Sequence, residues 1–273
     1  MRTALGLAIL LAAPAAAEPL IYDNGRIFVQ AAINGVPTEA LLDSGAESAV
    51  VDPVLAKRAG LPPGAKAEVQ GSGGEVDVRL VLGVTISAGG LTVKDQMVAI
   101  TDLTEVSGRL IKRPTQLIVG RELFDAGVIR VDIGKREWGP LAPGAKPAGV
   151  RLQLTKHAGI EAVPVTVNGV SAQADLDLGN GSKVLVSRAM AEKLKLKVVG
   201  QESGGGIGGK LTRDLVRIDR IEVAGRTFRD VDAAIDPFDN AGELNIGTSI
   251  LQHFVVTTDF RGRAVYLEPR EKE

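Results

Sequence analysis

The chain has 273 residues, of which 45% are hydrophobic, and its 32 basic and 33 acidic residues leave a formal net charge of −1. This composition predicts a folded protein with a packed core, and it offers neither nucleic acid nor anionic membranes a basic binding surface. Because cysteine is absent, disulfides, thiol catalysis and thiolate metal sites are excluded. The two histidines, His157 and His253, have no ligand cluster near them in sequence, so we expect no metal site.

The N-terminus has the layout of a secretory signal peptide. Arg2 precedes a short apolar run at 4–12, and Ala15-Ala16-Ala17 forms a small-residue cleavage site before Glu18. The run is too short to span a bilayer as a helix. We therefore expect residues 1–17 to be removed and the mature protein to be exported, without stable membrane insertion.

The beginning of the mature chain predicts a β-hairpin. Apolar residues at 26–33 and 36–42 flank Asn34-Gly35, and an Asn-Gly pair supplies the positive φ angles of a type I′ turn. Elsewhere, short Val/Ile/Leu-rich runs are separated by frequent glycines. The mature chain is therefore predicted to be mainly β.

The hairpin leads into an acidic loop, LLDSG at 41–45, and a short helix is expected after it. Asp52 can cap that helix, Pro53 can occupy its first turn and Gly60 can end it. A turn at 71–74 (GSGG), paired strands and the apolar segment LIVG at 117–120 complete this half.

The second half repeats this order of elements. The matching features are Asn168-Gly169, DLDLG at 175–179, a helix capped by Ser187, GGGIGG at 204–209, and LNIG at 244–247. A Pro/Gly/Ala stretch at 142–149 has the composition of a linker. We therefore predict two homologous lobes, 18–141 and 150–273, joined by 142–149, because this period is too long for a solenoid repeat.

The glycine pattern Gly204-x-Gly206-x-x-Gly209 also matches a dinucleotide-binding fingerprint. That fingerprint requires a helix after the glycines, whereas a β-rich, charged stretch follows here. A flexible hairpin is the better interpretation, and no cofactor is predicted.

The duplicated acidic loops carry a resemblance. Asp43-Ser44-Gly45-Ala46 with LIVG, and the weaker copy Asp177-Leu178-Gly179-Asn180 with LNIG, are similar to retropepsin-like and pepsin-like aspartic proteases in a bacterial exported two-lobe form. The resemblance implies two closed β-barrel-like lobes, each with one or two short helices, and a cleft between them. It also implies a periplasmic location, a peptide or protein substrate, and a flap that chain order places at Gly71-Ser72-Gly73-Gly74.

For function, the resemblance implies that Asp43 and Asp177 share one proton and activate a water molecule. Gly45 and Gly179 allow the tight turns, and Ser44 ties the loops together by hydrogen bonds. Asp175 is the register alternative to Asp177, because residues two apart on a strand point the same way.

Leu178 departs from the pattern, because it stands where the family has a hydroxyl residue. Losing that buried hydrogen bond would cost about 1–3 kcal/mol if a partner were left unsatisfied. Asn180 or Ser182 could restore the connection. Two alternatives to a single-chain endopeptidase follow: a non-catalytic peptide-binding or assembly module, and a protease that is active only as a homodimer of the first lobe.

Overall fold

The computed structural model describes residues 17–238 and 242–270, so the predicted signal peptide, apart from Ala17, lies outside the described residues. The strands of the first half are β1 (Glu18–Asp23), β2 (Arg26–Ile33), β3 (Val36–Leu42), β4 (Val50–Val51), β5 (Ala65–Gly71), β6 (Gly74–Ala88), β7 (Leu91–Ile100), β8 (Leu117–Val119), β9 (Ile129–Asp132) and β10 (Glu137–Pro140). Its helices are α1 (Pro53–Arg58), α2 (Thr104–Val106), the π-helix η1 (Ser107–Ile111) and α3 (Arg121–Phe124).

The strands of the second half are β11 (Val150–Gln153), β12 (Thr155–His157), β13 (Ile160–Val167), β14 (Val170–Leu176), β15 (Val184–Ser187), β16 (Val198–Gly206), β17 (Gly209–Val223), β18 (Arg226–Asp236), β19 (Leu244–Ile246), β20 (Phe254–Asp259) and β21 (Ala264–Pro269). Its helices are α4 (Arg188–Lys193) and α5 (Thr248–Leu251). Among the described residues, no helix has the length and apolar character needed to cross a bilayer.

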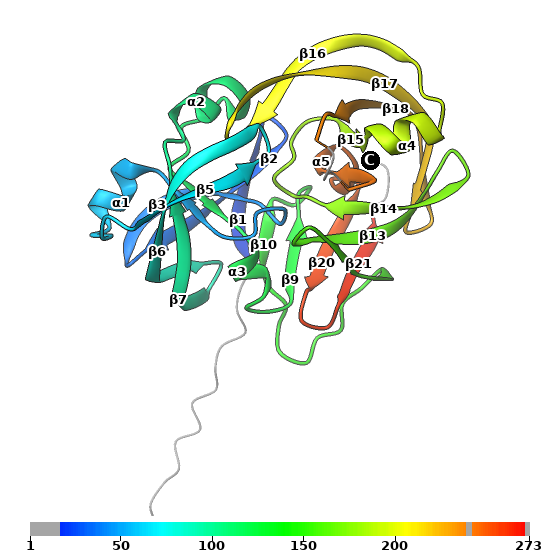
Figure 1. Ribbon diagram of the computed structural model, residues 1–273. Coiled ribbons are helices and arrows are strands. Elements are labelled where there is room, and N and C mark those ends of the chain that lie inside the picture. The colour runs from blue at the N-terminus through cyan, green and yellow to red at the C-terminus, as the bar shows by residue number, and fades with distance from the viewer. Residues whose placement is uncertain (1–16, 239–241, 271–273) are drawn as a thin grey trace, which may run out of the picture.

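Each lobe is a closed β-barrel. In lobe one, hydrogen-bonded pairing runs β2-β3-β8-β4-β7-β6 and returns from β6 to β2. In lobe two, the same circuit runs β13-β14-β19-β15-β18-β17 and returns to β13. Figure 1 shows the two barrels side by side. The predicted mainly-β architecture of two homologous lobes is confirmed.

A third sheet joins the barrels, and it contains strands from both halves. β9 of the first half pairs antiparallel with β20 of the second, with Val131 opposite Val256. β1 and β10 extend this sheet on one side, and β21 and β11 extend it on the other. Shared strand pairing of this kind holds the barrels in one relative position, so loops from separate barrels can form one site.

The local signals in the sequence correspond to the observed turns and caps. Asn34 and Asn168 both have positive φ and form the predicted β2–β3 and β13–β14 hairpins. The Asp52 carboxylate accepts a hydrogen bond from the Val54 N–H, and Ser187 caps α4 in the same way. By contrast, α2 and α3 have no side-chain cap, which is why the sequence contains no signal for them.

Candidate active site

The two acidic loops occupy equivalent places in the two barrels. Each follows a strand that pairs in parallel with the apolar segment ending in Gly120 or Gly247. The Asp43 N–H donates to the Val119 carbonyl at 2.9 Å, and the Asp177 N–H donates to the Ile246 carbonyl at 3.1 Å. The duplicated strands thus hold the start of both loops in the same way.

Within each loop, the aspartate closes its own turn. Asp43 Oδ1 accepts hydrogen bonds from the N–H groups of Gly45 (2.8 Å) and Ala46 (3.1 Å). Asp177 Oδ1 accepts from Gly179 (2.9 Å) and Asn180 (3.0 Å). One oxygen of each carboxyl group is therefore fixed by its backbone.

The two carboxyl groups meet where the loops of the two lobes meet, and each is packed against the glycine of the opposite loop. The glycines make this approach possible. A Cβ atom on Gly179 would lie 2.2 Å from Asp43 Cγ, and one on Gly45 would lie 2.9 Å from Asp177 Cγ. Since any side chain at these glycines would displace the opposite carboxyl group, both glycines are needed for contact between the aspartates.

Asp43 is poised to hold a proton. Burial raises its pKa well above the ordinary value of 3.8, and the negative charge of Asp177 and the hydrogen bond with its side chain raise it further. The N–H groups of Gly45 and Ala46 oppose this shift without cancelling it.

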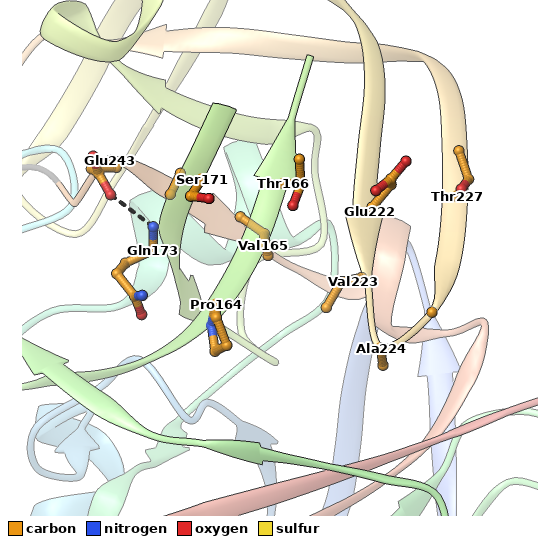
Figure 2. A pocket seen from close by; sticks show the side chains of 12 residues that line it. Pro164, Val165, Thr166, Ser171, Gln173, Glu222, Val223, Ala224, Thr227 and Glu243 are labelled. Carbon is orange, nitrogen blue, oxygen red and sulfur yellow. Dashed lines mark hydrogen bonds between the residues drawn. The ribbon is translucent and has the colours of Figure 1, made fainter. Parts of the chain in front are cut away.

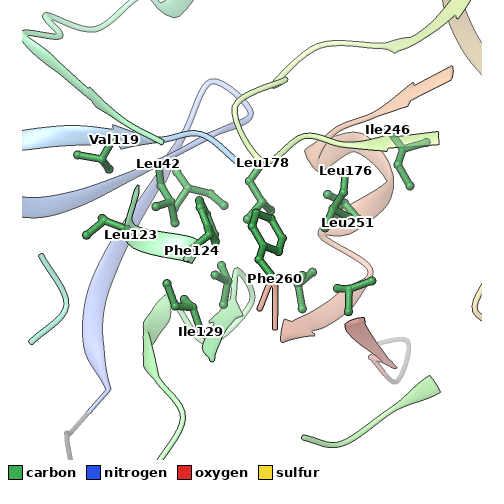
Figure 3. Close-up of a cluster of buried hydrophobic side chains, with 14 of the residues drawn as sticks. Leu42, Val119, Leu123, Phe124, Ile129, Leu176, Leu178, Ile246, Leu251 and Phe260 are labelled. Atoms are coloured by element: carbon green, nitrogen blue, oxygen red, sulfur yellow. The ribbon is translucent and has the colours of Figure 1, made fainter. Parts of the chain in front are cut away.

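Ser44 ties the loops together in both directions. Its hydroxyl donates to the Leu176 carbonyl at 2.7 Å and accepts from the Leu178 N–H at 2.9 Å. The Leu178 side chain points away from this contact and is fully buried in the apolar core between the lobes, near Phe124 and Phe260 (Figure 3). Leucine at this position removes the second hydroxyl but adds packing.

Asn180 supports Asp177 from within its own lobe and does not bond to the other loop. Its Nδ2 donates to Asn245 Oδ1 at 2.8 Å, and Asn245 Nδ2 donates to Asp177 Oδ2 at 2.7 Å. Ser182 donates its N–H to Asn180 Oδ1. The idea that Asn180 or Ser182 restores the link between the loops is therefore wrong, because the backbone turn directs both toward lobe two.

Asn245 is a site residue that motif matching missed. It occupies the second position of LNIG, where lobe one has the buried, apolar Ile118. With this bond the Asp177 carboxylate accepts three hydrogen bonds, which fix its orientation. The sequence signal for Asn245 as a site residue is its polar side chain within an otherwise apolar repeated segment.

Arg26 is a second unanticipated neighbour of the pair, at the start of β2. It is 5% exposed and donates from Nη1 to the Asn24 carbonyl at 3.1 Å. Burial lowers its pKa, and the negative charges of Asp177 and Asp43 counter that shift. No motif marks this arginine in the sequence, because only the fold brings it to the acidic loops.

Asp175, the register alternative, lies on β14 outside the loop. It is 5% exposed, and burial with the charges of Asp177 and Asp236 raises its pKa from 3.8 to about 7. The residue that faces Asp43 is Asp177.

We expect the variant Asp175→Asn to remove part of the pH dependence of stability. A carboxyl group whose pKa is higher in the folded state stabilises the protein fully below its unfolded pKa, and this contribution is lost as pH rises from about 4 to about 7. The wild type should therefore lose a few kcal/mol of unfolding free energy over that range from this residue alone. Urea unfolding at several pH values measures the unfolding free energy of both proteins. The same change of that free energy with pH in the wild type and in Asp175→Asn would contradict the prediction.

The glycine-rich turns form the tips of two hairpins. Gly71 and Gly74 close the β5–β6 hairpin around Ser72 and Gly73, where the flap was expected. Gly206 and Gly209 close the β16–β17 hairpin, so the glycine pattern at 204–209 belongs to strand pairing with no helix after it.

A surface hollow lies on lobe two, away from the acidic loops. It has a volume of about 630 Å³ and is lined by β13, β14, β17 and β18, with Glu243 accepting a hydrogen bond from the Gln173 N–H (Figure 2). Neither acidic loop contributes to its lining. In 17–238 and 242–270, no group of three or more His, Asp or Glu side chains is arranged to hold a metal ion.

Comparisons with known proteins agree with this geometry. A family model described as "Aspartyl protease" matches residues 29–123 and 163–250, which contain both acidic loops and both apolar-Gly segments. A search of curated proteins gave no match. Among solved structures, the chain is similar to a retropepsin-like aspartic protease from Rickettsia conorii, with 18% identity, a TM-score of 0.34, and coverage of 43% of this chain and 88% of that one. Because the family model matches more than half of the sequence, one segment in each lobe, the chain belongs to the aspartyl protease family.

Proposed function

We propose that the protein is an exported aspartic endopeptidase whose catalytic pair is Asp43 and Asp177. The observation that carries this proposal is the close approach of two half-buried carboxyl groups, each packed against the glycine of the opposite loop, together with the raised pKa of Asp43. Two carboxylates so close cannot both be ionised at moderate pH, so the pair retains one proton. That is the charge state needed for simultaneous general acid and general base catalysis.

The hydrogen bonds of the two aspartates assign one the role of general base and the other that of general acid. Asp177, which accepts from Asn245, acts as the ionised base and takes a proton from a water molecule bound between the carboxyl groups. Asp43 donates its proton to the carbonyl oxygen of the scissile peptide. Water attacks the carbonyl carbon and a tetrahedral diol forms, without a covalent enzyme intermediate.

The substrate class is an extended peptide. The hairpins β5–β6 and β16–β17 present backbone N–H and C=O groups that can pair with a peptide strand. Their tips touch, because the Gly73 N–H donates to the Ile207 carbonyl at 2.8 Å. Substrate entry therefore requires movement of at least one tip.

Export is part of the proposal and rests on the signal-peptide pattern of residues 1–17. In a bacterial cell it would place the mature enzyme in the periplasm. Since both acidic loops meet within one chain, the proposal needs no second copy of the protein.

The test is peptide cleavage by the mature chain, residues 18–273. A mixed peptide library is incubated with the protein at intervals from about pH 3 to pH 8, and products are identified by mass spectrometry; we expect a bell-shaped rate profile with an acidic optimum. A statine-type inhibitor should abolish cleavage, and a metal chelator, the control for contaminating metalloproteases, should not. Peptide binding without cleavage at any pH would refute the proposal and support a non-catalytic binding module.

A further inference from the structure

The two hairpins whose tips meet, β5–β6 and β16–β17, are anchored differently. Figure 1 shows β16 and β17 arching from lobe two across to α2 of lobe one. Among the residues that the structure describes, the tip of the β5–β6 hairpin is hydrogen-bonded across to the β16–β17 hairpin: Gly73 donates to Ile207, and Arg213 Nη2 of β17 donates to the Ser72 carbonyl at 3.4 Å. The tip of the β16–β17 hairpin has additional contacts.

The additional hydrogen bonds of this tip come from Arg109 of η1, and Ile207 at the tip also packs against the apolar cluster of lobe one that contains Phe28 and Leu103. Arg109 Nη1 donates to the Gly204 carbonyl at 2.9 Å. Its Nη2 donates to the carbonyls of Gly206 (3.3 Å) and Gly209 (3.2 Å). One guanidinium group from lobe one thus binds three carbonyls on both strands of a hairpin from lobe two.

Glu105 orients this guanidinium group. It lies one helical turn before Arg109, and its carboxylate pairs with Nε and with Nη2, the latter at 3.1 Å. The planar arginine fork therefore uses one edge for the carboxylate and the remaining N–H groups for the hairpin. The Arg109 side chain is 20% exposed, so the contacts are partly shielded from water.

The supporting segment exists in only one lobe. Residues 101–116 connect β7 to β8 and contain α2 and η1, whereas the matching connection between β18 and β19 is only residues 237–243. The pseudo-twofold symmetry of the barrels is broken where the arginine is placed.

The tip of the β16–β17 hairpin is also costly to order, because of its backbone conformation. Gly205, Gly208 and Gly209 have φ angles of 108°, 98° and 134°, which only glycine adopts readily. Such a glycine-rich tip loses much conformational entropy when it becomes ordered. Charge-assisted hydrogen bonds from outside the hairpin offset that loss.

We propose that Arg109 is a positioning residue that holds the β16–β17 hairpin closed over the acidic pair, so that substrate enters by movement of the β5–β6 hairpin alone. The route of substrate entry rests on the proposed function, whereas the anchoring of the β16–β17 hairpin by Arg109, the clamp, does not. The β16–β17 hairpin then stays fixed, and the β5–β6 hairpin moves to admit the substrate.

Hydrogen–deuterium exchange of the mature protein tests the clamp without substrate. In Arg109→Ala, we expect amides of the 203–212 segment to exchange at least about tenfold faster, and in Arg109→Lys and Glu105→Gln by a smaller factor. Arg217→Ala is the matched control, since it removes an exposed arginine ion pair with Asp232 from the same hairpin. Equal exchange in Arg109→Ala and Arg217→Ala would overturn the proposal; if Arg109→Ala does not fold, unchanged exchange in Arg109→Lys and Glu105→Gln would overturn it.

Steady-state kinetics test the consequence for substrate. Arg109→Ala should raise KM several-fold more than it lowers kcat, with an unchanged pH profile, because the carboxyl pair is untouched. A shifted pH profile or an unchanged KM would overturn the positioning role. A wild-type protein that shows no cleavage would refute the proposed function and leave the exchange result standing.

Discussion

Replacing Asp43 with asparagine is expected to reduce peptide cleavage by at least about 10³-fold. An amide can neither hold the shared proton nor donate it to the peptide carbonyl, and general acid–base catalysis commonly contributes about 10²–10⁴ in rate. Asp177→Asn should have a similar effect, because the carboxylate that activates water is lost. The double variant should be no worse than either single variant, since the two groups act as one unit. Initial rates of cleavage of one identified peptide measure all three.

The control for this prediction is Asp95→Asn. Asp95 is exposed and has a φ of 57°, a conformation that asparagine tolerates well. Activity should be unchanged in this variant. The folded state should survive Asp43→Asn, because the substitution replaces a half-buried carboxyl group with a neutral group of the same shape. Full activity in Asp43→Asn would show that the cleavage comes from another site.

Ser44→Ala is expected to lower both stability and activity. Ser44 is 4% exposed, and its hydroxyl makes the bonds to the Leu176 carbonyl and the Leu178 N–H. Removing it takes one hydrogen-bond partner from each of two buried backbone groups, at a cost of about 2–4 kcal/mol in unfolding free energy. The loops would then hold the carboxyl groups less firmly, and cleavage should fall by about 10-fold or more. Urea unfolding and cleavage kinetics measure the two effects.

Ser44→Thr is the matched variant, because it keeps the hydroxyl and therefore the link between the loops. It should retain more activity and stability than Ser44→Ala. If the alanine variant unfolded at the same urea concentration as the wild type, the hydrogen bonds of Ser44 would contribute nothing to stability and the other contacts between the lobes would be sufficient.

Much of the fold could be predicted because its signals are local. Asn34-Gly35 specifies a hairpin through the φ angles of two adjacent residues, and Asp52 caps α1 through a bond to a residue two positions away. The duplication made such signals stronger, since each occurred twice. Helix α3 had no such signal, because its N-cap residue is Gly120 and no side chain caps it.

The site was predictable in part. Asp43 and Asp177 stand out because each lies in a repeated loop, and Leu178 departs from that repeat. The consequence of this departure could not be foreseen. Whether the missing hydroxyl leaves a buried group unsatisfied depends on where the opposite Ser44 lies, and Ser44 is 134 residues away from its partner Leu178.

By itself, the sequence determined the hairpins, the helix caps and the two acidic loops with their glycines, because turn chemistry and capping act over a few neighbouring residues and the duplication shows each signal twice. The closed barrels were what the resemblance to aspartic proteases implied. Only the tertiary structure decided that the loops meet through a single serine, that Asn245 and Arg26 surround the aspartates, and that Arg109 holds one hairpin. Each of these contacts joins parts of the chain that only the closed barrels and their shared sheet bring within hydrogen-bonding or Coulombic range. Hydrogen bonds and charge interactions fall off over a few ångströms, so their partners are set by the fold and leave no periodic trace in the sequence.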